Sequence, residues 1–141
     1  MNIQIKYQSR GGNTRAAAEL IAGALSVASS SIKEPLEEKA DLLVLCGGTY
    51  AFKADPEMIA FIEALDPEKV GKTAVLVTAS GTKHGIKDIR RALEAKGLSP
   101  EERELHLPLG THGLTLIGRT GGSLPEKARK AVLSFAETLK A

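Results

Sequence analysis

Hydrophobic positions change from an alternating to a helical period within the first thirty residues. Every second residue from Ile3 to Tyr7 is apolar, which predicts a strand over residues 2–7. Apolar side chains then recur at helical spacing and predict a helix over residues 14–25. A weaker extended pattern lies near residues 27–32. The chain thus begins with a strand, a helix and a second extended segment.

Two uninterrupted aliphatic runs mark the centre of the expected sheet. Residues 42–46 and 73–78 lack alternation, as is typical of parallel strands covered by helices on both faces. Further extended fragments are expected at 105–109 and 114–117, around a turn at 110–113. The pattern there leaves open a broken strand or a short hairpin.

Start and stop signals predict the remaining helices. Asp55 as N-cap and Pro56 at the first helical position begin one helix. Gly97 ends the next, because a left-handed residue is needed there. Ser123 and Glu126 form a capping box for the last helix. The expected apolar faces are Met58, Ile59, Ile62 and Leu65; Ile86, Ile89, Ala92 and Leu93; and Ala128, Val132, Leu133, Phe135, Ala136 and Leu139.

This alternation of strands and helices predicts an α/β fold with three layers, a doubly wound parallel sheet between helices. The length of 141 residues predicts a single domain over residues 1–141. Gln4 and Lys6 are unusual in a strand expected at the centre of the sheet. Ligands of such sheets bind at the carboxyl ends of the strands, so we look for function in the loops that follow them.

Composition narrows the functional classes. Hydrophobic residues make up 43% and charged residues 26%, which is typical of a soluble domain. The net charge is only +2 and the charges are interspersed, which argues against nucleic acid as a partner. Without a membrane-spanning run or a signal-peptide pattern, the protein is predicted to be cytoplasmic and not bound to a membrane. The single cysteine, Cys46, ends a buried run and is expected to be structural.

The loop after the first strand has the residue types of an anion site. It leads directly into a helix N-terminus, whose unpaired amides and dipole favour a negative charge. Its hydroxyl and amide side chains add donors, and its glycines let a phosphate approach the backbone. The alternative interpretation is a structural turn with Asn13 as N-cap. The loop consists of Ser9, Arg10, Gly11, Gly12, Asn13, Thr14 and Arg15.

Two further loops follow the buried runs. The loop at residues 47–55 carries Tyr50, a candidate for stacking on a planar ring, and Phe52, which is expected to turn into the core. The other loop spans residues 79–85. The histidines are too scattered for a metal site, and none is predicted.

The first loop resembles that of the flavodoxin family, which typically reads Ser/Thr-x-Thr-Gly-Asn-Thr and wraps the FMN phosphate. Ser9, Gly12, Asn13 and Thr14 match, whereas Gly11 replaces a hydroxyl residue. The resemblance covers nearly the whole chain in order and implies five parallel strands in the order 2-1-3-4-5. It implies FMN contacts from Ser9, Arg10, Gly11, Gly12, Asn13 and Thr14, from Thr49, Tyr50, Ala51 and Phe52, and from Ala79, Ser80, Gly81, His84 and Gly85.

The resemblance implies an FMN-binding protein that passes electrons between redox partner proteins, as a monomer or weak dimer. Lys83 and His84 near the pyrimidine edge of the flavin predict a less negative second reduction potential than in acidic flavodoxins. Two alternatives stay open. One is a flavin-dependent reductase acting on a small substrate such as a quinone, and the other is a non-catalytic binding module that has lost FMN.

Overall fold

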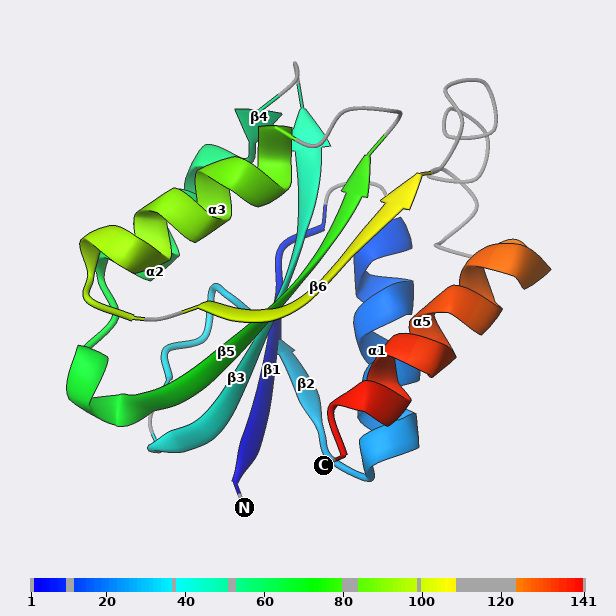
Figure 1. Ribbon diagram of the computed structural model, residues 1–141, viewed down its shortest axis with the longest axis horizontal. Coiled ribbons are helices and arrows are strands. Elements are labelled where there is room, and N and C mark those ends of the chain that lie inside the picture. The colour runs from blue at the N-terminus through cyan, green and yellow to red at the C-terminus, as the bar shows by residue number, and fades with distance from the viewer. Residues whose placement is uncertain are drawn as a thin grey trace.

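A parallel sheet lies between two layers of helices (Figure 1). The computed structural model describes residues 2–9, 12–36, 38–50, 53–79, 84–98, 100–108 and 124–140. Its strands are β1 (Ile3–Tyr7), β2 (Ser29–Ser31), β3 (Ala40–Tyr50), β4 (Lys53–Ala54), β5 (Val70–Ala79) and β6 (Pro100–Pro108). Its helices are α1 (Asn13–Leu25), α2 (Pro56–Glu63), the short 3-10 helix η1 (Pro67–Lys69), α3 (His84–Ala95) and α5 (Glu126–Thr138).

The sheet order within the described residues is β2-β1-β3-β5-β6, with all neighbours parallel. The two-residue strand β4 pairs antiparallel with the end of β3 and stands outside this order. Counted without β4, the order is the expected 2-1-3-4-5, so the predicted fold is confirmed. The order reverses between β1 and β3, and the loops that follow these two strands therefore lie at the switch point.

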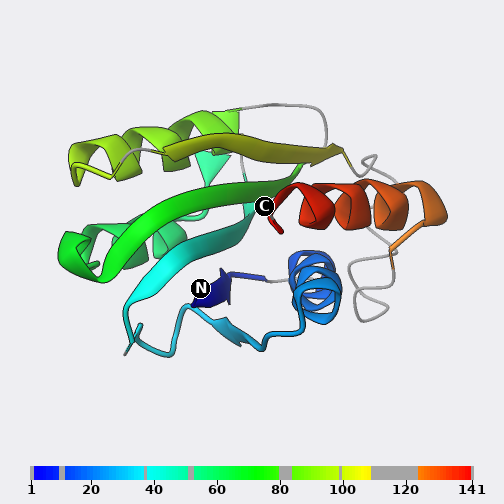
Figure 2. The same cartoon turned by 60° about the horizontal axis from the view of Figure 1, so that its bottom comes forward.

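The aliphatic residues of β3 pack against the helices on both faces of the sheet. Val44 and Cys46 pack with α1 and α5, whereas Leu43 and Leu45 pack with α2 and α3. Figures 1 and 2 show α1 and α5 side by side on one face and α2 with α3 on the other. No described helix is long and apolar enough to span a bilayer.

The sequence signals for helix ends are confirmed at the start of α2 and at the end of α3, whereas the capping box predicted for α5 is wrong. Asp55 caps α2 by accepting a hydrogen bond from the Glu57 amide at 2.8 Å, and Gly97 has a φ of +76° after α3. Pro125, not Ser123, occupies the N-cap of α5, and no side chain caps that helix. Ser123 lies outside the described residues.

Leu133 corrects the apolar face predicted for α5. Its exposed fraction is 40%, whereas the neighbouring Val132 is fully buried. The helical turn places position 133 above the exposed Arg129, beyond the stripe that faces the sheet. The other predicted residues of this face are buried.

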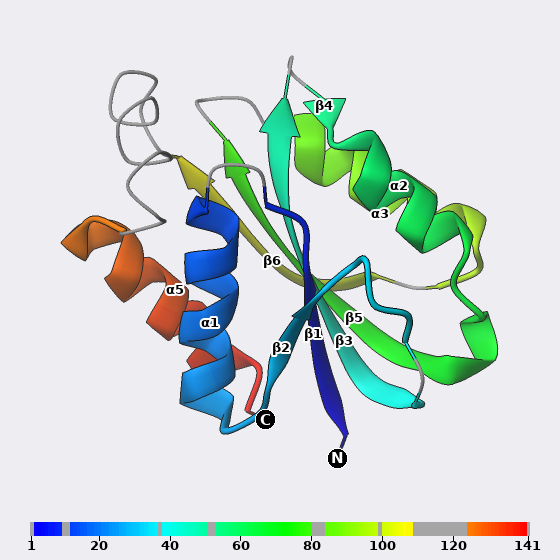
Figure 3. The ribbon, with the colours of Figure 1, turned by 180° about the vertical axis from the view of Figure 1, so that it is seen from behind.

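The polar residues of β1 have a structural explanation. Ile3, Ile5 and Tyr7 belong to the α1 side of the sheet, and Lys6 lies on the other side. There the described residues of the crossover from β2 to β3 form no helix, and they run across β1 (Figure 3). The Lys6 ammonium, 3% exposed, donates to the carbonyl oxygens of Glu34 at 2.8 Å and Pro35 at 3.4 Å.

Candidate functional site

The helix α1 begins just after a glycine. Gly12 occupies the N-cap with a φ of 98°, and its amide donates to Ser9 Oγ at 3.0 Å, which folds the loop back on itself. Among the described residues no side chain caps α1, and its first turn contains no acidic residue. By contrast, α2 has the Asp55 cap and Glu57 in its first turn. The interpretation of Asn13 as an N-cap is wrong, because Asn13 is the first helical residue.

Asn13 presents a buried polar group without a partner. The residue is only 5% exposed, and its Oδ1 accepts no hydrogen bond from the part of the chain that the structure describes. An unpaired buried polar atom costs roughly 1–3 kcal/mol. Turning the amide by 180° exchanges oxygen and nitrogen and places an N–H donor at the same point. A bound phosphate would accept that donor, so the residue fits an anion that the helix N-terminus also favours.

Thr14 joins this loop to the end of β5. Its hydroxyl oxygen lies 2.9 Å from that of Thr78, and the two residues are 2% and 7% exposed. Each hydroxyl donates one hydrogen bond and accepts up to two, so the pair retains acceptor capacity. The contact joins the start of α1 to the end of β5.

Thr49 and Gly85 meet on the other side of the sheet. Thr49 Oγ1 is buried without a hydrogen-bond partner, and a Cβ atom at position 85 would collide with it. The Asp88 carboxylate accepts from the amide of Ala54 at 3.1 Å, which ties α3 to β4. The end of β3 is therefore packed closely against the first turn of α3.

The structure thus brings the predicted residues together at two places. Ser9, Gly12, Asn13 and Thr14 lie at the N-terminal end of α1, and Thr49 lies against Gly85. The predictions for Arg10, Gly11, Ala51, Phe52, Ser80, Gly81 and Lys83 fall outside the described residues, as do those for the side chains of Tyr50, Ala79 and His84.

A cleft of about 470 Å³ lies beside Ser9 and Gly12, in the loop before α1 that is predicted to bind a phosphate and is called the phosphate loop below. The Arg15 guanidinium lies 5.7 Å from the centre of the Tyr7 ring and pairs with Glu19 at 2.8 Å, and the hydrogen bond to Glu19 raises the pKa of Arg15. The sequence predicted only part of the positive charge that lines this cleft. Lys33 belongs to a crossover whose sequence has no periodic hydrophobic pattern. The lining residues are Tyr7, Gln8, Ser9, Gly12, Arg15, Ser31, Ile32, Lys33 and Glu57.

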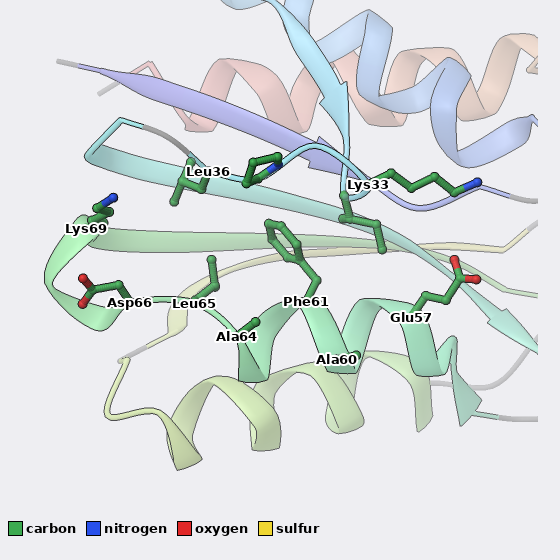
Figure 4. A pocket seen from close by; sticks show the side chains of 11 residues that line it. Lys33, Leu36, Glu57, Ala60, Phe61, Ala64, Leu65, Asp66 and Lys69 are labelled. Carbon is green, nitrogen blue, oxygen red and sulfur yellow. The ribbon is translucent and has the colours of Figure 1, made fainter.

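A larger groove of about 640 Å³ runs between the crossover and α2 (Figure 4). Phe61 of α2 and Leu65, just after the end of α2, face Leu36 of the crossover across it, and none of its described lining residues is a predicted site residue. The groove lies where a crossover helix would stand in a doubly wound sheet. It shares Lys33 and Glu57 with the smaller cleft.

Cys46 takes part in the core, not in the candidate site. It is fully buried at the centre of the sheet, and burial raises the pKa of its thiol to about 12. A thiol with such a pKa holds its proton at neutral pH and is a poor nucleophile.

Known proteins share this architecture. Flavodoxin 2 from Bacillus cereus superposes with a TM-score of 0.73 at 19% sequence identity, covering 99% of this chain and 98% of that one. A flavodoxin from the domain Archaea gives 0.69 at 16% identity, and a cysteine-to-serine mutant of the Pseudomonas aeruginosa flavodoxin gives 0.68 at 16%, each covering 100% of both chains. Curated protein sequences give no match. Residues 4–110 match the family described as Flavodoxin domain, and the chain belongs to that family.

Proposed function

We propose that this protein binds FMN and transfers electrons between redox partner proteins. The observation that carries the proposal is the buried Asn13 side chain, whose Oδ1 has no hydrogen-bond partner among the described residues, beside the N-terminus of α1, which no described side chain caps. A dianionic phosphate satisfies both features, because it accepts hydrogen bonds from backbone amides and from a side-chain amide. Membership of the flavodoxin domain family supports the flavin as the group that carries this phosphate.

In this proposal the chain binds and orients the cofactor. Ser9, Gly12 and Asn13 hold the phosphate end, and the loops after β3 and β5 hold the ring. The contact between Thr14 and Thr78 joins the start of α1, at the phosphate end, to the end of β5. FMN supplies the redox chemistry.

An absorbance spectrum of the purified protein, followed by calorimetric titration with FMN and riboflavin, tests the binding. We expect FMN to bind at least tenfold more tightly than riboflavin, which lacks the phosphate. Absence of binding by either flavin would contradict the proposal.

A second measurement distinguishes a carrier from a reductase. The FMN-loaded protein, photoreduced without oxygen with EDTA as the electron donor, should pass electrons rapidly to a one-electron acceptor protein such as cytochrome c. Steady-state turnover of a quinone with a nicotinamide donor, without an added partner protein, would instead favour the reductase.

A further inference from the structure

Exposed cations gather where β4 meets α3. Lys53 of β4 and Lys87 and Arg91 of α3 are all exposed, and the Arg91 side chain is 79% exposed. The Ala54 amide donates to the Asp88 carboxylate at 3.1 Å and so holds the two elements together. Because each of these two partners is next to one of the lysines in the sequence, the three cations belong to one region of the surface. Lys53, Lys87 and Arg91 are called the basic surface below.

The basic surface borders the loops proposed to hold the flavin ring. The strand β4 pairs with the end of β3, and α3 follows the loop after β5. Figures 1 and 3 show β4 beside the start of α3, at the end of the sheet toward which the arrows of β3 and β5 point. A protein that approaches a ring held by these loops therefore passes beside the basic surface.

Little negative charge opposes these cations. Asp88 lies among them, but its carboxylate is engaged by the amide of β4 at 3.1 Å and by Arg91 at 3.9 Å. Lys53 and Lys87 make no ion pair within the described part of the chain. Glu94, the next exposed acid along α3, follows Arg91 by about one turn, toward the other end of the helix. The basic surface therefore carries an excess of positive charge.

Helix stability does not explain the cations of α3. A helix N-terminus is the positive end of the helix dipole, so acidic side chains are favourable there and cations are not. The helices α2 and α5 have Glu57 and Glu126 in their first turns, whereas the first turn of α3 has no acidic residue and Lys87 is its fourth residue. Lys87 and Arg91 are also four positions apart, a spacing at which like charges repel on a helix. The fold gains little from these two charges, which favours a role outside the fold.

We propose that the basic surface docks an electron-transfer protein whose surface around its own redox centre is acidic. The inference rests on the proposed function and names the chemistry of one redox partner. Opposite charges steer two proteins together and raise their association rate, and salt screens this effect. In each encounter one electron passes from the reduced FMN to the oxidised metal centre of the partner, which is reduced by one electron.

Stopped-flow mixing of the photoreduced, FMN-loaded chain with oxidised rubredoxin, an acidic one-electron iron protein, tests the inference. We expect the second-order rate constant to fall roughly fivefold or more between about 20 and about 300 mM NaCl. Lys87→Glu and Arg91→Glu should each lower it roughly threefold or more at the lower salt concentration, and less at the higher. With basic cytochrome c as the acceptor, both variants should react faster than the parent.

Lys39→Glu is the matched control. It makes the same change in net charge at an exposed lysine just before β3, at the opposite end of the sheet. It should leave the rate constants for both acceptors within about twofold of those of the parent. Because the three substituted residues are exposed, all three variants should keep the FMN affinity and the thermal midpoint of the parent chain.

The possible results separate this inference from the proposed function. If the chain binds FMN but Lys87→Glu and Arg91→Glu change the rubredoxin rate no more than Lys39→Glu does, the docking surface alone is overturned. Cosedimentation of the chain with phosphatidylserine vesicles, abolished by Lys87→Glu, would identify a membrane site and would also overturn it. If the chain binds no flavin, the proposed function and the inference are overturned together.

Discussion

The hydroxyl groups of Thr14 and Thr78 lie 2.9 Å apart, although 64 positions separate them in the sequence. Thr14 belongs to the first turn of α1, and Thr78 is the penultimate residue of β5. Both are buried, so neither hydroxyl exchanges this partner for water at low cost. The hydrogen bond joins the first turn of α1 to the end of β5, and both elements border the proposed flavin site.

Thr78→Val should destabilise the protein by about 1–3 kcal/mol, because it leaves the buried Thr14 hydroxyl without a partner. Urea denaturation measures the free energy of unfolding. The Thr14→Val, Thr78→Val double variant should be less destabilised than the sum of the two single variants, because it removes both polar groups. Strict additivity would show that the two hydroxyls do not interact.

Local sequence patterns predicted the role of a residue correctly where that role depends on its own helix or strand. Asp55 caps α2 through an amide two positions away, and the left-handed Gly97 follows α3. The buried run at 42–46 became the centre of β3 because a continuous aliphatic segment suits only a strand covered on both faces. These features, together with the alternation of elements, were enough to predict the fold.

The features that the sequence did not reveal depend on contacts distant in the chain. Lys6 can be buried because its ammonium donates hydrogen bonds to backbone carbonyl oxygens some thirty positions later in the chain. Those carbonyl groups belong to the crossover from β2 to β3, whose described residues form no helix. Lys33 has no periodic pattern around it, so its place beside the phosphate loop follows only from the packing of that crossover. Leu133 was wrongly placed on the buried face of α5, because an apolar residue at the edge of a helical stripe can face either the core or the solvent.

Lys6→Met should lower the free energy of unfolding by about 1.5–3 kcal/mol, because hydrogen bonds to a charged group are lost and the crossover carbonyls lose their donor. The methionine retains most of the aliphatic stem, so the change isolates the ammonium. Lys39→Met on the exposed surface is the control and should change stability by less than about 0.5 kcal/mol. Equal stabilities of the two variants would contradict the role of the Lys6 ammonium.

Gly85→Ala should destabilise the protein by about 1–3 kcal/mol, because the added Cβ collides with Thr49 Oγ1 and lies 3.2 Å from Val77 Cγ1. Gly23→Ala is the matched control: that position is helical and exposed, and a Cβ there meets nothing within 4 Å. It should stabilise the protein by about 0.5–1 kcal/mol. Thermal denaturation of both variants measures the difference, and a stabilising Gly85→Ala would contradict the close packing of β3 against α3.

The stability of the protein should fall at alkaline pH in part because of Cys46. Burial raises the pKa of its thiol from 9.0 to about 12, so the folded state retains a proton that the unfolded chain loses. The contribution is complete below pH 9 and decreases between pH 9 and 12, with a limiting slope of about 1.4 kcal/mol per pH unit. Cys46→Ala lacks this contribution, so the stability difference between parent and variant should shrink over that interval. A constant difference in urea denaturation from pH 8 to 11 would contradict the raised pKa.

Asn13→Ala should separate the stability of the protein from its affinity for FMN. Without a ligand, the variant should be at least as stable as the parent, because a buried amide oxygen without a partner is removed. Its FMN binding should weaken by about 1–3 kcal/mol, the range for a hydrogen bond to a charged group, while riboflavin binding stays constant. Asn13→Asp should weaken FMN binding further, since a carboxylate repels the phosphate.

For each variant, titrations with FMN and with riboflavin and one denaturation curve distinguish a structural role of Asn13 from a role in binding phosphate. A structural role predicts lower stability of the unliganded variant and a parallel loss for FMN and riboflavin. A phosphate ligand predicts a loss for FMN alone, which grows as the salt concentration falls in Asn13→Asp because screening of the added charge decreases. An unchanged FMN affinity in both variants would remove Asn13 from the site and leave its buried oxygen unexplained.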